Sequence, residues 1–345
     1  MRPGPSKALP EPSECSLADK VRFLSSPRSY ADGRDRVEVV ETHMAFVFLI
    51  ARFAYKMKKP VRFPFLDFSS LEARRRDCLD ELRLNRRLAP EVYLDVVPLT
   101  LEHPRRLALA GSGEPVEWLV WMKRLPGEAM LDRAIERAAV DQATLGPVAE
   151  LLADFYRDAP SCTPPVVPYQ DLFRREIEEI GRDLASPNFG LPEPLVRGLA
   201  EGQTAFLDRR GALLDERAEK GRVVEGHGDL RAEHVHLGPP PSVIDCLEFD
   251  RDLRTLDAVD DLGFLWLDCE RLGAAAAGEY VMDVYRRATG DRPPDELLRF
   301  YRSYRALTRA RIAVRHLLDE DPGDPARWRG AALTWLTLSR RHLPP

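Results

Sequence analysis

The sequence lacks the usual marks of an exported or membrane-spanning protein. Its five cysteines are scattered and form no C-x-x-C pair, which argues against a disulfide framework or a thiolate zinc site and fits a reducing cytoplasm. No stretch approaches the roughly 20 consecutive apolar residues of a membrane span. Residues 1–12 are polar and rich in proline, without the apolar segment of a signal peptide. We therefore expect a cytoplasmic protein that does not cross a membrane.

Positive charge is not in excess either. A net charge of -5 and a pI near 5.9 give no bulk attraction to a polyanion, so nucleic acid is not an expected partner. The sequence contains no G-x-x-x-x-G-K-[ST] segment, which excludes a P-loop nucleotide site. With 345 residues, 44% of them hydrophobic and 31% charged, the chain is long enough for two lobes with their own cores. Nothing in it indicates protein partners.

The first part of the chain is predicted to be a β-rich lobe. Residues 1–16 are expected to form a disordered tail, because their proline, serine and glycine content offers little to bury. In residues 17–125, aromatic and β-branched runs predict strands at 44–50, 53–57, 92–97 and 116–122. Between them, Ser69 and Glu72 have the spacing of a helix cap and its N3 partner, and Pro90 stops that helix. Pro126 and Gly127 mark a turn, so we expect the lobe to end near residue 125.

The rest of the chain, residues 126–345, is predicted to be a larger helical lobe. Apolar residues recur there with helical spacing in seven segments, namely 145–156, 172–184, 195–220, 256–272, 280–288, 296–318 and 325–341. A short β-patch interrupts these helices. The expected fold class is therefore α+β, with a small β-rich lobe and a larger helical one.

The most informative segments lie in this β-patch. They read EGHGDLRAEHVHL at residues 225–237 and VIDCLEFD at residues 243–250. Asp229 follows a glycine in a tight loop, where its carboxylate can accept or orient the proton of a hydroxyl. Asp245 ends an apolar strand and is a hard oxygen ligand suited to Mg²⁺, with His234 as a second candidate ligand. These are the parts that phosphoryl transfer requires, because that reaction needs an oriented acceptor and neutralised phosphates.

A cation for the phosphates is predicted in the first lobe. Lys56 lies on a predicted strand, and Glu81 in the helix that follows can hold its ammonium by an ion pair. Lys58 and Lys59 compete for the same role, and strand alternation places Lys56 and Lys58 on one face. Lys56 is the preferred candidate.

Taken together, these residues resemble a known family. The order of Tyr55-Lys56, Glu81, the HGD at 227–229, His234 and Ile244-Asp245 resembles the protein-kinase-like superfamily, and HGD is similar to its aminoglycoside phosphotransferase branch. More narrowly, five segments resemble a bacterial group of aminoglycoside-phosphotransferase-like proteins, sometimes fused to a P-loop domain. They are ETH at 41–43, YKMKKPV at 55–61, FLDFS at 65–69, ELRLNRRLAP at 81–90 and DCLEF at 245–249. The resemblance covers roughly residues 35–320.

The resemblance implies a bilobal protein-kinase-like fold that uses ATP, with GTP as the alternative, together with Mg²⁺ or Mn²⁺. Val120 and Met122 would belong to the hinge whose backbone meets the adenine. Asp261 would brace the loop that carries Asp229. Lys56 would bridge the α and β phosphates.

Two neighbours of Asp229 carry their own alternatives. His227 fits a structural histidine that braces the loop by hydrogen bonds better than a proton shuttle. Arg231 is placed either to contact the γ-phosphate or to form a surface ion pair with Glu233. Glu248 and Asp250 are either solvated acids or a receptor for a cationic substrate.

The sequence departs from the family pattern at three places. His234 stands where asparagine is usual, and imidazole is a softer ligand, which favours Mn²⁺ or a single metal. The expected phosphate-covering loop, ETHMAF at 41–46, contains no glycine. Gly228 precedes Asp229 where switchable kinases have arginine, so constitutive activity is expected rather than activation by phosphorylation.

The predicted function is transfer of the γ-phosphoryl group of ATP to a hydroxyl of a small molecule, such as a sugar, an aminoglycoside or an amino alcohol. One alternative is a nucleotide-binding pseudokinase, which the glycine-free loop and His234 favour. Another is a metallohydrolase, since His227, Asp229, His234 and His236 have the His-x-Asp and His-x-His spacings of metal ligands.

Overall fold

The computed structural model describes residues 15–31, 36–63, 66–103, 106–162, 167–318 and 323–345. Nearly all of the predicted tail at 1–16 lies outside these ranges. The chain forms two compact units, one of residues 1–130 with 234–251 and the other of residues 131–233 with 252–345. Residues 234–251, which the sequence analysis grouped with the helical lobe, thus share a unit with the N-terminal strands.

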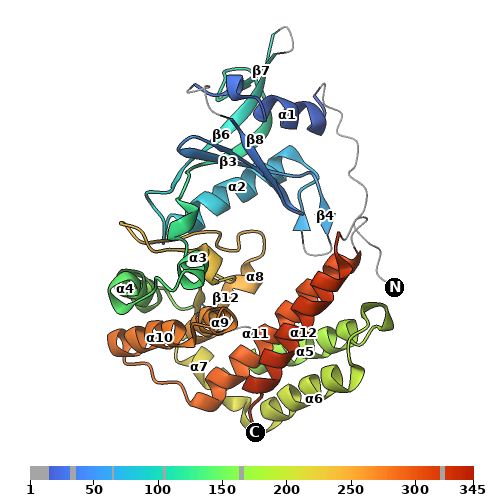
Figure 1. The fold of residues 1–345 in the computed structure, drawn as a ribbon, viewed down its shortest axis with the longest axis vertical. Coiled ribbons are helices and arrows are strands. Elements are labelled where there is room, and N and C mark those ends of the chain that lie inside the picture. The colour runs from blue at the N-terminus through green and yellow to red at the C-terminus, as the bar shows by residue number, and fades with distance from the viewer. Residues whose placement is uncertain (1–14, 32–35, 64–65, 104–105, 163–166, 319–322) are drawn as a thin grey trace. The chain divides into compact units, whose positions relative to one another are not determined.

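The first unit is built on an antiparallel sheet of six strands in the order β1-β2-β3-β8-β6-β7 (Figure 1). The strands are β1 (Glu38–Glu41), β2 (Ala45–Ile50), β3 (Phe53–Lys58), β6 (Tyr93–Glu102), β7 (Arg106–Leu109) and β8 (Glu114–Lys123). The four strands expected from aromatic and β-branched runs are β2, β3, β6 and β8. Two short ladders accompany the sheet, β4 (Arg62–Phe63) with β5 (Leu66–Asp67) and β10 (Val235–His236) with β11 (Ser242–Val243).

Helix α2 spans Leu71–Asn85 and is capped by Ser70, whose hydroxyl accepts the N–H of Ala73 at 3.1 Å. The cap therefore lies one residue later than predicted, and Glu72 falls one position short of N3, which is Ala73. The reason is local, because the hydroxyl and N–H of Ser69 are bound by the carboxylate of Asp67 at 2.6 and 3.0 Å.

Buried charges join the helices of this unit to its sheet. Glu117 of β8 is fully buried and accepts from Arg74 of α2 at 2.8 Å and from Lys20 at 3.1 Å. Lys20 belongs to helix α1 (Leu17–Leu24). Breaking such a network by removing one partner leaves an uncompensated buried charge, so these contacts fix how α1 and α2 lie on β8. Apolar side chains fill the space around them, among them Leu24, Phe48, Met57, Leu99 and Leu119.

The second unit is mainly helical. Its longer helices are α4 (Gln142–Asp158), α5 (Tyr169–Leu184), α6 (Glu193–Arg210), α7 (Ala212–Glu219), α9 (Ala258–Arg271), α10 (Ala275–Thr289), α11 (Asp295–Arg315) and α12 (Pro325–His342). Shorter helices are α3 (Leu131–Glu136) and α8 (Arg251–Arg254). The seven predicted helical segments all fall on helices, but the one at 195–220 is two helices. They meet at Gly211, where a Cβ would lie 1.9 Å from the side-chain oxygen of Gln170.

Two features of the second unit position the HGD loop. Strand β9 (Val223–Glu225) pairs with β12 (Thr255–Asp257) and leads directly into the loop. Asp257, at the start of α9, is held by the buried guanidinium of Arg217, which also bonds Asp291 at 2.7 Å.

Helices α11 and α12 pack against each other along their length (Figure 1). The expected α+β fold is confirmed.

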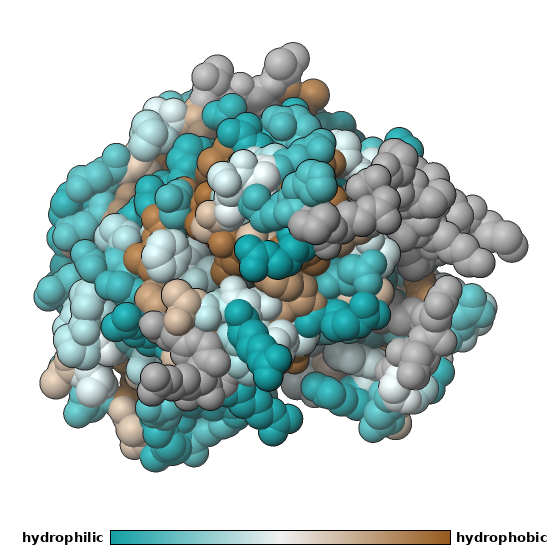
Figure 2. All heavy atoms as spheres, turned by 90° about the horizontal axis from the view of Figure 1, so that it is seen from above, coloured by the Kyte–Doolittle hydropathy of each residue, from teal (hydrophilic) through white to brown (hydrophobic). Residues whose placement is uncertain are grey.

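The surface matches the charged composition. Hydrophilic side chains cover most of the face in Figure 2, with smaller apolar areas between them. Among the described residues, no helix combines the length and the apolar character that crossing a membrane would require.

Candidate active site

The predicted cation and its carboxylate partners come together in the first unit. Lys56 of β3 places its Nζ 2.9 Å from Oε1 of Glu81 on α2 and 2.9 Å from Oδ1 of Asp245. Its side chain is 16% exposed, whereas that of Glu81 is 1% exposed. Burial alone would lower the pKa of Lys56, but the carboxylates of Asp245 and Glu81 raise it well above its ordinary value. The ammonium is therefore fixed in its charged form between Glu81 and Asp245.

Asp245 has a conformation that few non-glycine residues adopt. Its φ is 60°, in the left-handed region, and its N–H donates to the phenol oxygen of Tyr93 at 3.2 Å. Lys56 holds the pKa of the Asp245 carboxyl well below its usual range. Such backbone outliers cost of order 1 kcal/mol or more and cluster at functional sites. The left-handed backbone of Asp245 directs its ionised carboxylate toward Lys56.

The two candidate metal ligands are neighbours. Nε2 of His234 lies 3.6 Å from Oδ2 of Asp245, and the carbonyl of His234 accepts the N–H of Ile244 at 2.9 Å. Oδ1 of Asp245 is bound by Lys56. The atoms left to ligate a metal are therefore Oδ2 of Asp245 and Nε2 of His234. Atoms at this separation can ligate the same ion, and the softer imidazole nitrogen favours Mn²⁺ over Mg²⁺.

A second lysine, Lys58, is buried next to the first. Its Nζ contacts Glu81 Oε2 at 2.6 Å, Asp77 Oδ2 at 2.9 Å and the carboxylate of Glu248, and its side chain is 1% exposed. Glu248, for which solvated and substrate-binding roles were open, is thus buried against Lys58. Asp77, Glu81 and Glu248 have the spacing of a metal site. Because the ammonium of Lys58 contacts all three, a lysine occupies the place between them that a metal ion would take.

The segment after Asp245 is anchored to the end of α2. The N–H of Cys246 donates to the side-chain oxygen of Asn85 at 2.9 Å, and the amide nitrogen of Asn85 donates to the carbonyl of Glu81 at 2.9 Å. Arg87 contacts the Cys246 sulfur at 3.3 Å. The residue that holds Lys56 and the loop that carries Asp245 are therefore linked through one side chain, Asn85.

The HGD loop in the second unit is held by Asp261 of α9. Its carboxylate accepts the N–H of His227 at 2.7 Å, the N–H of Gly228 at 3.1 Å and the hydroxyl of Tyr156 at 2.8 Å. Gly228 has a φ of 86°, where a side chain would be strained. His227 is fully buried, and its Nδ1 accepts the N–H of Asp229 at 3.3 Å. Asp261 and His227 thus lie where a bracing role requires them.

Arginines surround the carboxylate of Asp229. Arg231 donates through Nε to both oxygens, at 3.1 and 3.0 Å, and also pairs with Glu233. Arg309 of α11 approaches Oδ1 to 3.9 Å. The Asp229 side chain is 27% exposed, so it remains open to solvent on one side.

Val120 and Met122 lie inside the sheet. Val120 pairs with Lys56 on β3 and with Val96 on β6, and Met122 is likewise flanked on both sides. Their backbone groups therefore face neighbouring strands, and an adenine contact through them stays a prediction. The histidines of the metallohydrolase hypothesis are not on one strand, because His234 ends a 3₁₀ turn before β10 begins and only His236 belongs to the strand.

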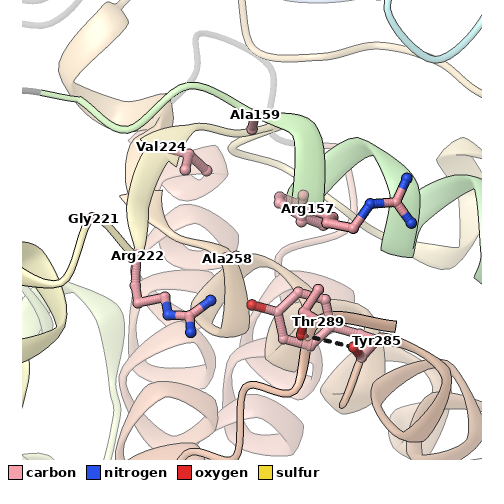
Figure 3. Close-up of a pocket in the computed structure, with 9 residues that line it drawn as sticks. Arg157, Ala159, Gly221, Arg222, Val224, Ala258, Tyr285 and Thr289 are labelled. Carbon is pink, nitrogen blue, oxygen red and sulfur yellow. Dashed lines mark hydrogen bonds between the residues drawn. The ribbon is translucent and has the colours of Figure 1, made fainter. Parts of the chain in front are cut away.

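A small cavity lies elsewhere in the second unit. Its volume is about 110 Å³, and its lining comes from α4, β9, α9, α10 and the segment between α7 and β9 (Figure 3). The lining residues are Tyr156, Arg157, Ala159, Gly221, Arg222, Val224, Ala258, Tyr285 and Thr289. None of the predicted site residues is among them, although Tyr156 also bonds Asp261.

Sequence reasoning did not assign several residues that contact the candidate ones, among them Lys58, Tyr93, Tyr156 and Arg309. Only Lys58 carried a signal, because strand alternation places it on the face of Lys56. The others reach the site from positions distant in sequence, which periodicity cannot reveal.

Relatives of this chain are found both by sequence and by fold. No family model matches the chain. Uncharacterized proteins of Mycobacterium tuberculosis and Mycobacterium bovis are 33% identical to it over 300 residues, which cover 82% of this chain and 58% of theirs. The chain thus spans somewhat more than half the length of these curated relatives.

Solved structures share the fold across nearly the whole chain. A choline/ethanolamine kinase family protein from Mesorhizobium loti has a TM-score of 0.55 at 14% identity, covering 96% of both chains. Choline kinase from Cryptosporidium parvum has a TM-score of 0.55 at 11% identity, covering 94% of both. The GDP complex of aminoglycoside 2'-phosphotransferase-IIIa has a TM-score of 0.54 at 18% identity, covering 93% of this chain and 98% of that one. By its fold, the chain resembles choline/ethanolamine kinases and an aminoglycoside phosphotransferase.

Proposed function

We propose that the protein transfers the γ-phosphoryl group of ATP to a hydroxyl of a small molecule. The observation that carries this proposal is the contact of Lys56 with both Glu81 and Asp245, at 2.9 Å each, in a protein-kinase-like fold. A lysine held by a helix glutamate next to a metal-binding aspartate is the arrangement that positions nucleotide phosphates in such kinases. GTP is the alternative donor, which the GDP bound in the aminoglycoside 2'-phosphotransferase structure supports.

In this mechanism the first unit binds the donor. Lys56 would exchange its contact with Asp245 for the α and β phosphates, while Glu81 keeps its ammonium in place. Asp245 and His234 would hold a divalent cation, and that cation would neutralise charge on the phosphates. The low pKa of Asp245 keeps this ligand ionised throughout the physiological range.

The second unit would act on the acceptor. Asp229 would orient the hydroxyl and take its proton as the oxygen attacks the γ-phosphorus. Asp261 and His227 act as positioning residues, since their hydrogen bonds fix the backbone on which Asp229 is carried. The choline, ethanolamine and aminoglycoside kinases among the similar structures support a small molecule with a hydroxyl group as the acceptor.

Nucleotide binding tests the donor half of the proposal. Melting temperature would be measured with ATP, GTP and ADP, each with Mg²⁺, with Mn²⁺ and with chelator. We expect a metal-dependent rise that Asp245→Ala abolishes. Asp283→Ala is a matched control, because Asp283 is a surface aspartate of α10 with 46% side-chain exposure against 48% for Asp245. A parent chain that gains no stability under any of these conditions would overturn the proposal.

Turnover tests the acceptor half. ADP formation from ATP would be followed with a panel of sugars, amino alcohols and aminoglycosides. Asp229→Asn should keep the nucleotide-dependent rise in melting temperature and lose at least about 99% of turnover, since a positioned base contributes about 10²–10⁴-fold. Full turnover by Asp229→Asn would show that another group serves the acceptor.

A catalytically weak pseudokinase is the second candidate, and one observation favours it. The β1–β2 connection is a tight turn in which Thr42 N–H donates to the Ala45 carbonyl at 2.9 Å and the Thr42 hydroxyl accepts the Ala45 N–H at 3.0 Å. This turn closes without glycine, so side chains stand where kinases usually bring bare backbone to the phosphates. Metal-dependent nucleotide binding with no turnover on any acceptor would select this candidate.

A further inference from the structure

Arg309 is a mostly buried cation whose hydrogen-bonding capacity is unused. Its side chain is 20% exposed, and its nearest opposite charge is Asp229 Oδ1, at 3.9 Å from Nη1. It donates no hydrogen bond to any residue in the described ranges, and its buried Nε is among the unpartnered atoms. Its other contact is the ring of Trp335, 6.0 Å away. An arginine offers five N–H donors, and charges this far from water are normally paired.

Arg231 brings a second guanidinium to the same place. Its side chain is 16% exposed and grips Asp229 through Nε and Nη2, the latter at 3.0 Å. Glu233, which also contacts Arg231, is 51% exposed and therefore well screened by solvent. The remaining acid nearby, Asp268, is committed to Arg271 at 2.7 Å and to the N–H of Ala232 at 3.0 Å.

Two guanidiniums, those of Arg231 and Arg309, therefore face the single carboxylate of Asp229. Burial lowers the pKa of Arg309, and repulsion from Arg231 adds to that effect. An anion placed between the two guanidiniums would offset both the burial of Arg309 and its repulsion from Arg231. It would also supply hydrogen-bond acceptors for the unused N–H donors. Guanidinium groups suit this role, since their planar forks match the oxygens of phosphate and carboxylate.

Resting on the proposed function, we propose that Arg309 and Arg231 bind an acid group of the acceptor, a phosphate or a carboxylate. The acceptor is then a hydroxyl compound that carries negative charge, such as a hydroxy acid or a sugar phosphate. This differs from choline, ethanolamine and aminoglycosides, which are cations.

Binding of that acid group also prepares Asp229. When Arg231 turns its donors to the acid group, the carboxylate of Asp229 is released to meet the acceptor hydroxyl. The hydroxyl oxygen then forms a bond to the γ-phosphorus, the bond from that phosphorus to the β-phosphate oxygen breaks, the proton passes to Asp229 and ADP leaves. In the absence of an acceptor, Asp229 stays paired with Arg231, which suppresses transfer to water.

Anion binding without nucleotide tests the inference directly. The melting temperature of the full chain would be measured with inorganic phosphate, glycerate and glycerol 3-phosphate, and with glycerol, choline chloride and sodium chloride at matched ionic strength. We expect a rise with the oxyanions alone, and an apparent affinity about tenfold or more weaker in Arg309→Gln. Arg309→Lys keeps the charge but not the fork, and we expect it to bind the oxyanions more weakly than the parent as well.

Arg315→Gln is the matched control, because Arg315 lies on the same helix with 46% side-chain exposure and pairs with Asp183 away from Asp229. It should retain the full response. Unfolding curves without anion establish that Arg309→Gln is folded. An oxyanion response that is missing in the parent, or unchanged in both Arg309 variants, overturns the inference.

Measurements with ATP and with ADP show whether the arginine binds the acceptor or the transferred phosphoryl group. The difference in melting temperature between ATP and ADP, each with metal, should be the same in Arg309→Gln and the parent. If Arg309→Gln loses this difference but keeps its response to glycerate and phosphate, the arginine serves the transferred phosphoryl group, and the acceptor assignment is wrong. Nucleotide binding by the parent is measured separately from oxyanion binding. A missing oxyanion response would therefore leave the proposed phosphotransferase function intact, and missing nucleotide binding would leave the oxyanion site intact.

Discussion

Lys56 and Lys58 show how residues of one type, two positions apart on one strand, acquire different tasks. Both contact Glu81, but the side chain of Lys56 is 16% exposed and that of Lys58 is 1% exposed. Lys56 can therefore reach a ligand, whereas Lys58 is enclosed by Asp77, Glu81 and Glu248. The sequence predicted that a lysine of this segment binds the nucleotide phosphates. The greater exposure of Lys56 supports it as the choice over Lys58.

Exchanging each lysine for alanine should separate these tasks. Lys58→Ala removes the cation that Asp77 and Glu248 contact and leaves Glu81 with Lys56 alone, so we expect the free energy of unfolding to fall by about 3–5 kcal/mol. Lys56→Ala should cost less stability, because its site is partly open to water, and should lose most nucleotide affinity. Urea unfolding and nucleotide titration measure the two effects. A Lys58→Ala variant as stable as the parent would contradict the buried role of Lys58.

Glu248 should make stability depend on pH near neutrality. Burial raises the pKa of its carboxyl to about 7, against the attraction of Lys58. A carboxyl with a raised folded pKa stabilises the fold fully at low pH and loses that contribution as pH rises through its folded value. Between about pH 5 and pH 8 the parent should therefore lose on the order of 2 kcal/mol relative to Glu248→Gln. Glu233→Gln, at an exposed site, should follow the parent, and parallel curves for parent and Glu248→Gln would rule out the shift.

At the scale of elements, periodicity predicted most strands and helices because their apolar faces are regular. It failed where a single local contact decided the outcome. Ser70 rather than Ser69 caps α2 because Asp67 occupies Ser69, and the helix expected at 195–220 breaks where Gly211 passes Gln170.

The candidate site followed the same rule. Asp229, Asp245, Lys56 and Glu81 could be proposed from short motifs, because each lies beside residues that identify its motif, and their roles stay predictions. Arg309 and Tyr93 could not be found that way, since each reaches an aspartate from a helix or strand far along the chain. Hydrogen bonds from such distant positions depend on packing, which residue order alone does not encode.

The loop between β9 and Asp229 tolerates little added volume. A Cβ on Gly226 would lie 2.6 Å from Oδ2 of Asp261 and 3.0 Å from Leu256. Gly226→Ala should therefore push Asp261 away from the backbone it braces, lower stability by about 1–3 kcal/mol and reduce turnover more than nucleotide binding. Gly198→Ala is the control, because nothing lies within 4 Å of its Cβ in α6, and it should be neutral or slightly stabilising. Equal effects of the two substitutions on melting temperature and turnover would contradict the brace.

At the scale of the whole molecule, the two units are interleaved along the chain. Residues 234–251 complete the first unit, although residues 131–233 of the second separate them from the rest of it. They supply Asp245 to Lys56 and Glu248 to Lys58. A cut at the sequence-predicted boundary near residue 125 would therefore separate Lys56 and Lys58 from two of their carboxylate partners, Asp245 and Glu248.

This interleaving predicts how fragments behave. Residues 1–130 alone should unfold at lower temperature and with less cooperativity than the same residues joined to 234–251 by a flexible linker. The reason is that the fragment lacks the acids and the β10–β11 ladder of its own unit. Circular dichroism melting of the two chains makes the comparison. Identical melting would mean that residues 234–251 are not needed for the first unit to fold.

The tight turn between β1 and β2 has a consequence for the ionic environment. Under the proposed function, a turn without glycine leaves the donor phosphates to charged groups, chiefly Lys56 and the cation held at Asp245. Attraction between charges weakens as salt shortens the screening length, which is about 8 Å at physiological ionic strength. Backbone amide contacts are far less sensitive. Nucleotide affinity in this protein would then follow the salt concentration of its surroundings more steeply than in kinases with a glycine-rich loop.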